Sequence, residues 1–405
     1  MGDVSGENYA EVKEELGILV GGLFEQAGLP VPEKGTIPGK FREFLVSAAK
    51  KSPTGQIVVL IDEYDEPIAA FLDDLKTLKR VRKLLHDFYE KLKFSSDSIR
   101  FLMMTGVTKL TKLSVFSGLN HLKDRSMDER FATLLGYTPD ELDGALRENV
   151  EVFGEKNGMD FKAAKAALLS WYDGYRFSPR SEARVCNPVS LGSALESGEL
   201  KGYWETTGRT TLVINCMANA GKLPADLENV PARPLTLDVC DAETLPMVSL
   251  LYQGGYLTIK DVKKGDPTKD ETDSYVLAPP NLEVREALFE GYLSQAMGLD
   301  EDPFNTLVDK AKQQIDSGDI ADVVETMLFS LYAQIPPDWR IKDEAEAKRY
   351  FQLFFAMLGA NPAPEFPSAR GYADKWIGGA RPVTLIGINF NLKKRNIDIP
   401  VVEPA

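Results

Sequence analysis

Five consecutive apolar residues, Ile57 to Ile61, run directly into two acids, Asp62 and Glu63. A short apolar run that is rich in β-branched side chains is typical of a buried strand in a parallel sheet. Such a strand delivers the residues that follow it to the carboxyl edge of the sheet. The pattern therefore predicts a fully buried strand over residues 56–61 with two carboxylates at its end.

A second apolar run covers residues 100–107 and contains Thr105 near its end. Between the two runs, residues 72–93 alternate basic groups with apolar residues at helical spacing. Strand, long helix and strand in this order predict a βαβ unit with a right-handed crossover. This topology would place Thr105 beside Asp62.

Paired acids at the end of a buried strand are typical of nucleotide-hydrolysing sites, where the first acid orients Mg²⁺ and the second polarises the attacking water. The structural alternative is a pair of acids that cap the next helix or face solvent. Thr105 has a similar alternative, a hydroxyl bonded to a backbone carbonyl. Thr108 and Lys109 follow and could contact phosphate, or could lie in solvent.

The sequence contains no phosphate loop of the form G-x-x-x-x-G-K-[ST]. The nearest stretch, residues 35–41, has its glycines one position too close and a phenylalanine where Ser or Thr is needed. We interpret it as a helix N-terminus.

Arg176 and Arg209 lie in aromatic-rich clusters with Trp171 and Trp204. Either arginine could reach a phosphate from a neighbouring domain, or pair with a local acid.

The composition narrows the function classes further. A formal charge of −14 over 405 residues argues against a dedicated basic nucleic-acid surface, although it leaves room for a small basic patch. Three cysteines without CxxC spacing and only two histidines argue against zinc, disulfide and multi-histidine sites. No signal peptide and no apolar run of about 18 residues is present, so we expect a cytoplasmic protein without membrane spans.

The pattern along the chain divides into three regions. We expect an α/β domain with a nucleotide-type sheet over residues 1–138, a mainly helical middle region with a small strand pair over 139–280, and a helical linker with a short α/β tail over 281–405. Further expected elements are helices at residues 8–28, 40–51 and 159–172, a small strand pair at 247–260 and 273–277, and a last strand at 383–390.

Several motifs, in this order, resemble the bacterial AAA-ATPase-like family, which joins a P-loop ATPase-like domain to a PD-(D/E)xK nuclease-fold domain. These motifs are Leu60-Ile61-Asp62-Glu63-Tyr64-Asp65-Glu66-Pro67, Thr105-Gly106-Val107, Trp171-Tyr172-Asp173-Gly174-Tyr175-Arg176-Phe177, Asn187-Pro188-Val189-Ser190 and Tyr203-Trp204-Glu205-Thr206-Thr207-Gly208. The resemblance implies that Asp62 and Glu63 are the Walker B pair, that Thr105 is a sensor-like position, and that Mg²⁺ and ATP are the cofactors.

Two departures from the family shape the expected fold. The family's phosphate loop would lie upstream of Met1, and the interval between the first and last nuclease-like segments is reduced to residues 360–369. That interval has no room for the two strands that hold the nuclease metal. We therefore expect an incomplete P-loop NTPase-type parallel sheet, a helical middle region and a truncated nuclease-fold tail without nuclease activity.

Three hypotheses follow for the function. The chain is an ATPase-like protein with a Walker B half-site that is weak or defective in ATP binding and hydrolysis. Alternatively, a separately encoded phosphate loop completes a working ATPase. In the third hypothesis the aromatic clusters of the middle region form a protein-interaction module. The partners expected are another protein or a second copy of the chain, and neither a membrane nor, through this chain alone, nucleic acid.

Overall fold

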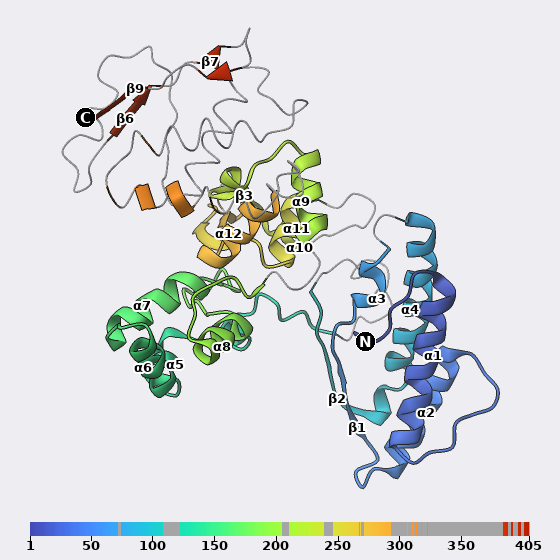
Figure 1. The fold of residues 1–405 in the computed structure, drawn as a ribbon. Coiled ribbons are helices and arrows are strands. Elements are labelled where there is room, and N and C mark those ends of the chain that lie inside the picture. The colour runs from blue at the N-terminus through green and yellow to red at the C-terminus, as the bar shows by residue number, and fades with distance from the viewer. Residues whose placement is uncertain are drawn as a thin grey trace.

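The computed structural model describes residues 1–71, 74–107, 122–204, 210–238, 246–266, 268 and 271–292, scattered positions from 306 to 322, and short strands between 384 and 404. Figure 1 shows the N-terminal residues as a unit beside the helical middle region. The most extensive contacts between the elements of residues 1–292 lie within residues 9–104 and within residues 139–291.

The N-terminal unit is built from four helices and a small parallel sheet. Helix α4 connects the two strands, which pair in parallel, so the predicted βαβ unit is confirmed. The elements are α1 (Tyr9–Gln26), α2 (Ile37–Lys51), β1 (Ile57–Ile61), α3 (Glu66–Ala69), α4 (Leu75–Phe94), a 3-10 turn (Ser96–Ser98) and β2 (Ile99–Met104).

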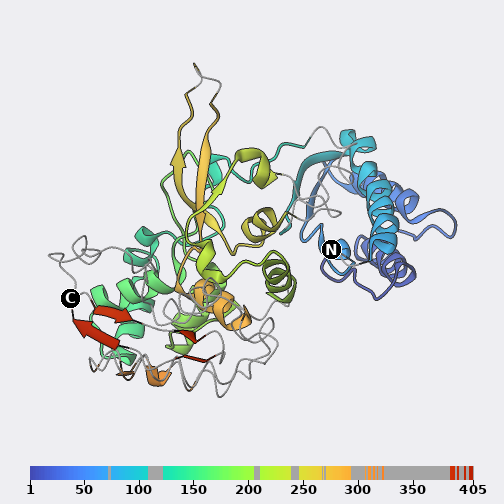
Figure 2. The same ribbon diagram turned by 90° about the horizontal axis from the view of Figure 1, so that it is seen from above.

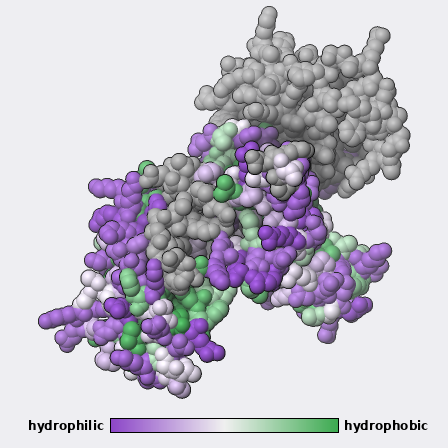
Figure 3. Space-filling model, turned by 180° about the vertical axis from the view of Figure 1, so that it is seen from behind, coloured by the Kyte–Doolittle hydropathy of each residue, from purple (hydrophilic) through white to green (hydrophobic). Residues whose placement is uncertain are grey.

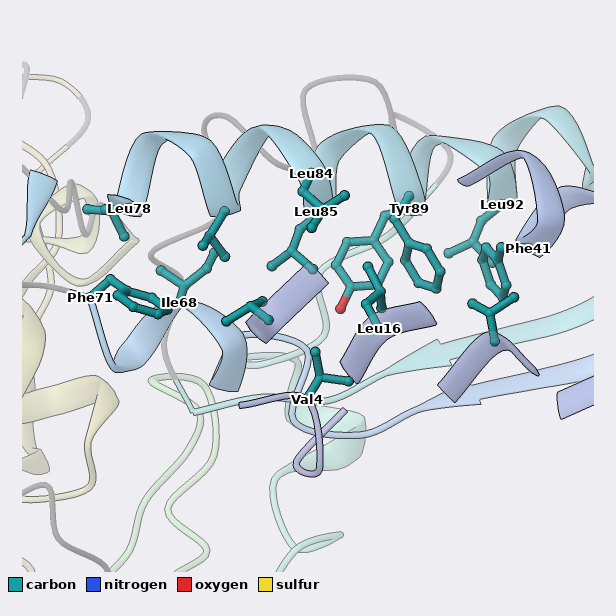
Figure 4. Packing of buried hydrophobic residues seen from close by; sticks show 14 of the residues in the cluster. Val4, Leu16, Phe41, Ile68, Phe71, Leu78, Leu84, Leu85, Tyr89 and Leu92 are labelled. Atoms are coloured by element: carbon teal, nitrogen blue, oxygen red, sulfur yellow. The ribbon is translucent and has the colours of Figure 1, made fainter. Parts of the chain in front are cut away.

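The core of this unit lies between α4, α1 and α2. Leu78, Leu85 and Leu92 recur on one side of α4 and point into this core together with Tyr89 (Figure 4). The ring of Phe41 from α2 stacks on Phe88 with ring centroids 4.1 Å apart. This spacing of apolar residues is why the sequence between the strands forms one long amphipathic helix.

The two strands are not fully buried, contrary to the sequence prediction. Val58 and Leu60 of β1 are 56% and 69% exposed, and Phe101 of β2 is 53% exposed, whereas Val59 packs against the core. The helices cover one face of the sheet, so strand alternation turns every second apolar side chain outward. Within the described residues β1 and β2 each have one strand partner.

The middle region contains most of the remaining helices and a three-stranded antiparallel sheet of order β3-β5-β4. The β4–β5 hairpin projects from the rest of the structure (Figure 2). The elements are a 3-10 turn (Glu129–Phe131), α5 (Pro139–Asp143), α6 (Arg147–Lys156), α7 (Phe161–Tyr172), α8 (Pro188–Ser197), α9 (Thr210–Asn219), a 3-10 turn (Pro224–Leu227), β3 (Val230–Ala232), α10 (Pro234–Asp238), α11 (Met247–Gln253), β4 (Thr258–Lys263), β5 (Ser274–Ala278) and α12 (Leu282–Gly291).

Part of the predicted strand pair of this region is wrong. Residues 247–253 form the helix α11, and the strand β4 begins only at Thr258. A short apolar run fits a buried helix as well as a strand, and Gly255, with φ +80°, follows the helix end. The partner strand expected at residues 273–277 is confirmed as β5, which pairs with β4 in antiparallel register.

The C-terminal part is described only as short strands. β6 (Thr384–Gly387) pairs with β9 (Val401–Pro404), and β7 (Phe390–Asn391) pairs with β8 (Asn396–Ile397). The expected strand at residues 383–390 is therefore present in part. The predicted nuclease-fold tail otherwise lies outside the described residues. Among the helices that the structure describes, none combines the length and the apolar character that a membrane span requires.

Candidate functional site

The parallel register of the sheet brings the ends of β1 and β2 together. Ile61 pairs with Met104, and the pairing continues beyond both strands. The amide of Thr105 donates to the carbonyl of Ile61 at 2.9 Å, and the amide of Tyr64 donates to the carbonyl of Thr105 at 3.0 Å. Asp62, Glu63 and Thr105 therefore meet at one edge of the sheet, as the sequence predicts.

Asp62 is the centre of this edge. Its Oδ1 accepts hydrogen bonds from the hydroxyl of Thr105 and, at 3.0 Å, from the amide of Glu63. Asp62 is itself exposed. Both hydrogen bonds end on the same oxygen, so Oδ2 remains available to a cation.

Glu63 has an unusual backbone conformation. Its φ is +53°, and it is the one residue other than glycine with positive φ in the part of the chain that the structure describes. A side chain in this left-handed region costs roughly 1–2 kcal/mol, and such strain is concentrated at functional sites. The carboxylate is exposed and lies against Gly2, where a Cβ would come within 2.0 Å of Oε2.

Asp65 differs from the two acids before it, because it is only 1% exposed. Its Oδ1 accepts a hydrogen bond from the amide of Val107 at 3.1 Å. A Cβ on Gly106 would lie 2.4 Å from that oxygen. Asp65 thus fastens the segment after β2 to the segment after β1, and this clamp, which the sequence analysis missed, positions Thr105.

Tyr89 of α4 contacts the segment that follows β1. Its hydroxyl donates to the carbonyl of Tyr64 at 3.1 Å, and burial, together with the nearby Asp65, raises the pKa of the phenol. The tyrosine therefore remains a neutral donor.

The four acids of residues 62–66 do not form one cluster, since Asp65 turns into the protein while Asp62 and Glu63 face solvent.

The other candidate phosphate ligands divide into three groups. Residues 35–41 form a helix N-terminus, as interpreted from the sequence, with the Thr36 hydroxyl accepting from the amide of Gly39 at 3.2 Å. Arg176 is buried and pairs with Glu182 at 2.8 Å, so its guanidinium is used locally. Thr108, Lys109 and Arg209 lie outside the described residues.

The aromatic clusters of the middle region do not form an open platform. Trp171, Phe177 and Trp204 are each partly buried. The indole of Trp204 packs edge-on against Tyr256 with ring centroids 4.5 Å apart. Glu283, which is 1% exposed, accepts hydrogen bonds from the amides of Tyr203 and Trp204 at 2.7 and 3.0 Å. These contacts pack the described aromatic residues against neighbouring elements, and the protein-interaction hypothesis stays a prediction.

Residues 2–116 match the AAA-ATPase-like family model, described as predicted AAA-ATPase. The match covers the N-terminal unit, including Asp62, Glu63 and Thr105. It supports the AAA-ATPase-like resemblance for this region of the chain.

A second comparison extends further along the sequence. The chain is 28% identical over 408 residues to a protein of Azotobacter chroococcum mcd 1 named "Uncharacterized protein in vnfD 5'region", with 89% of this chain and 74% of that protein covered. No solved structure matches the chain.

Proposed function

We propose that the N-terminal unit supplies the acidic half of a nucleotide-hydrolysing site of the P-loop type. In this proposal Asp62 holds Mg²⁺, Glu63 polarises the attacking water, and Thr105 is the sensor-like position. The observation that carries the proposal is the meeting of Asp62, Glu63 and Thr105 at the carboxyl edge of a parallel sheet, with Glu63 in a strained conformation. The AAA-ATPase-like match over residues 2–116 supports it.

The donor set fits Mg²⁺ bound with nucleotide. Magnesium is usually held by one or two carboxylates together with phosphates and water, and not by a cage of protein ligands. Asp62 offers one exposed carboxylate with a free oxygen, and the described residues contain no cluster of three acids, cysteines or histidines arranged to hold a metal ion. When bound, the ion would neutralise charge on the phosphates.

Each residue would then have a separate task. The Thr105 hydroxyl and the Glu63 amide fix the orientation of the Asp62 carboxylate, so that this group need not reorganise when a cation binds. The exposed Glu63 carboxylate is able to accept a hydrogen bond from water. The clamp between Asp65 and Val107 keeps Thr105 next to Asp62.

The phosphate cradle is the missing part of this site. Residues 1–405 contain no G-x-x-x-x-G-K-[ST] loop, so we expect them to bind ATP weakly and to hydrolyse it poorly on their own. The sheet has apolar side chains on its uncovered face, and parallel sheets are normally covered on both faces. We propose that a strand–loop–helix segment from another polypeptide or coding segment covers this face and brings the phosphate loop to Asp62.

Nucleotide binding with and without Mg²⁺ tests the half-site. We expect weak binding of ATP that is strengthened by Mg²⁺ and loses this dependence in Asp62→Ala. The matched control is Asp97→Ala, which removes an exposed carboxylate near the opposite end of β2. An equal effect of both substitutions would refute the role of Asp62. Fast hydrolysis by the 405-residue chain that survives Glu63→Gln would refute both the weak activity and the role of Glu63.

A further inference from the structure

Four polar side chains of the middle region are buried, although one atom of each lacks a hydrogen bond. The atoms without a partner among the described residues are Tyr175 OH, Ser190 Oγ, Asn281 Nδ2 and Glu283 Oε2. Hydrophilic residues cover much of the surface that Figure 3 shows, whereas these four residues are between 0% and 8% exposed. Leaving a buried polar atom unsatisfied is costly, so each such atom in a native protein calls for an explanation.

The carboxylate of Glu283 lies at the centre of this group. Its Oε1 accepts hydrogen bonds from the amides of Tyr203 and Trp204, which leaves Oε2 without a partner. Burial raises the pKa of Glu283, and the Tyr203 amide and the Ser190 hydroxyl oppose the shift, so this hydroxyl lies beside the carboxylate. Burial and the charge of Glu283 both raise the pKa of the Tyr175 phenol, which therefore keeps its proton near the same carboxylate.

The backbone explains how Asn281 and Tyr175 reach the same place. Asn281 is the N-cap of α12, and its Oδ1 accepts a hydrogen bond from the amide of Val284 at 3.0 Å. The cap uses the oxygen of the side chain and leaves Nδ2 as a buried donor. Gly174 has φ +120°, and a Cβ there would lie 2.0 Å from the carbonyl oxygen of Pro280. The segment of Tyr175 therefore lies against the segment that begins α12.

We propose that these four atoms bind an ordered water molecule at the junction of α8, the start of α12 and residues 203–204. Water fits this set because it both donates and accepts: Glu283 Oε2 accepts, Asn281 Nδ2 donates, and the two hydroxyls do either. A buried water typically makes about three hydrogen bonds to polar groups that otherwise have no partner. A metal ion fits less well, since Nδ2 carries only hydrogens and the described residues contain no cluster of three acids, cysteines or histidines arranged to hold one.

The bound water gives three motifs of the middle region a shared task. Tyr175, Ser190 and Tyr203 belong to three different sequence motifs of this region. Glu283 holds the backbone of residues 203–204 through Oε1 and, through the water on Oε2, reaches Ser190 on α8. One water molecule thus ties α8 to α12 inside the protein, where a direct hydrogen bond between Ser190 and Glu283 is not formed.

Urea unfolding of Ser190→Ala tests the proposal through the sign of its effect. The substitution removes one partner of the water, so we expect the equilibrium constant of unfolding to rise about fivefold or more, although alanine is the better helix former within α8. Without a water, the same substitution deletes an unsatisfied buried hydroxyl, so unchanged or increased stability would overturn the proposal. The matched control is Ser95→Ala, because the Ser95 hydroxyl is also buried without a partner among the described residues but lies in the N-terminal unit. Equal losses in both variants would overturn the proposal as well.

A crystal structure of the unmodified full chain, at a resolution that shows ordered waters, tests the site directly. We expect a water within about 2.7–3.2 Å of Glu283 Oε2 and of at least two of the other three atoms. A direct hydrogen bond between Ser190 and Glu283 would overturn the proposal, and so would the absence of electron density for a water among the four atoms. The crystal structure needs no variant, so it decides the question even where a substitution disturbs folding.

Discussion

The hydroxyl of Thr105 donates a hydrogen bond to the carboxylate of Asp62 across the carboxyl edge of the β1–β2 sheet. The two residues are 43 positions apart in the chain and meet because α4 returns the chain to a parallel neighbouring strand. This contact links the first candidate catalytic acid to the end of the adjacent strand. Substitutions that move the segments after β1 and β2 should therefore alter the position of the Asp62 carboxylate.

The strained backbone of Glu63 makes a prediction about stability. Glu63→Gly should raise the free energy of unfolding by about 0.5–1 kcal/mol, because glycine accepts positive φ without steric cost. Glu63→Gln keeps the strain and should change stability by less than about 0.5 kcal/mol. Urea unfolding of both variants measures the difference. A destabilised Glu63→Gly variant would contradict the assignment of strain to this residue.

The clamp around Asp65 predicts coupled effects of two substitutions. Gly106→Ala should destabilise the protein by about 1–3 kcal/mol, since the new Cβ would lie 2.4 Å from Asp65 Oδ1 and 2.7 Å from the ring of Tyr64. In the double variant Asp65→Ala/Gly106→Ala, the loss of stability should be smaller than the sum of the two single losses by about 0.5–3 kcal/mol. The double-mutant cycle is measured by urea unfolding.

Gly21→Ala is the control for this cycle. Gly21 lies inside α1, and a Cβ there meets nothing within 4 Å. The substitution should stabilise the protein by about 0.5–1 kcal/mol through helix propensity. Additive effects of the changes at residues 65 and 106 would contradict the clamp.

The exposed face of the sheet predicts different costs at neighbouring positions. Leu60→Thr should change the free energy of unfolding by less than about 0.5 kcal/mol, because Leu60 is 69% exposed. Val59→Thr places a hydroxyl against the core and should cost about 1–3 kcal/mol. Chemical unfolding of the two variants compares the faces directly. Similar large losses at both positions would mean that the outer face is covered in solution.

Burial raises the pKa of Glu283 from its ordinary value of 4.5, although the amides of Tyr203 and Trp204 oppose the shift. Above pH 4.5 the folded protein therefore retains a proton that the unfolded chain loses. The stability linked to Glu283 is complete below that pH and is lost as the pH rises through the folded pKa. Removing the ionisable group by Glu283→Gln should remove this loss.

The measurement is the free energy of unfolding across a pH series from 4 to about 8. Relative to the unmodified chain, Glu283→Gln should become progressively more favourable as the pH rises. Glu148→Gln, at an exposed position on α6, provides the comparison and should give a curve parallel to the unmodified chain. A parallel curve for Glu283→Gln would argue against a raised pKa at this position.

Local sequence patterns predicted the elements of the N-terminal unit well. The apolar periodicity of α4 and the helix N-terminus at residues 35–41 depend on a few neighbouring residues, and the structure confirms both helices. The pattern misassigned residues 247–253, because a seven-residue apolar run does not distinguish helix from strand. Which face of β1 is covered depends on helices elsewhere in the chain.

The sequence by itself determined that two acids follow an apolar strand and that Thr105 ends its parallel neighbour, because chain order and periodicity fix these relations. Only the tertiary structure decided that Asp62 and Glu63 face solvent while Asp65 is buried in a clamp with Val107. The reason is physical: the direction of each carboxylate depends on local backbone dihedrals and on packing partners 40 residues away or more. The spacing of the acids along the sequence specifies neither the backbone dihedrals nor the packing partners.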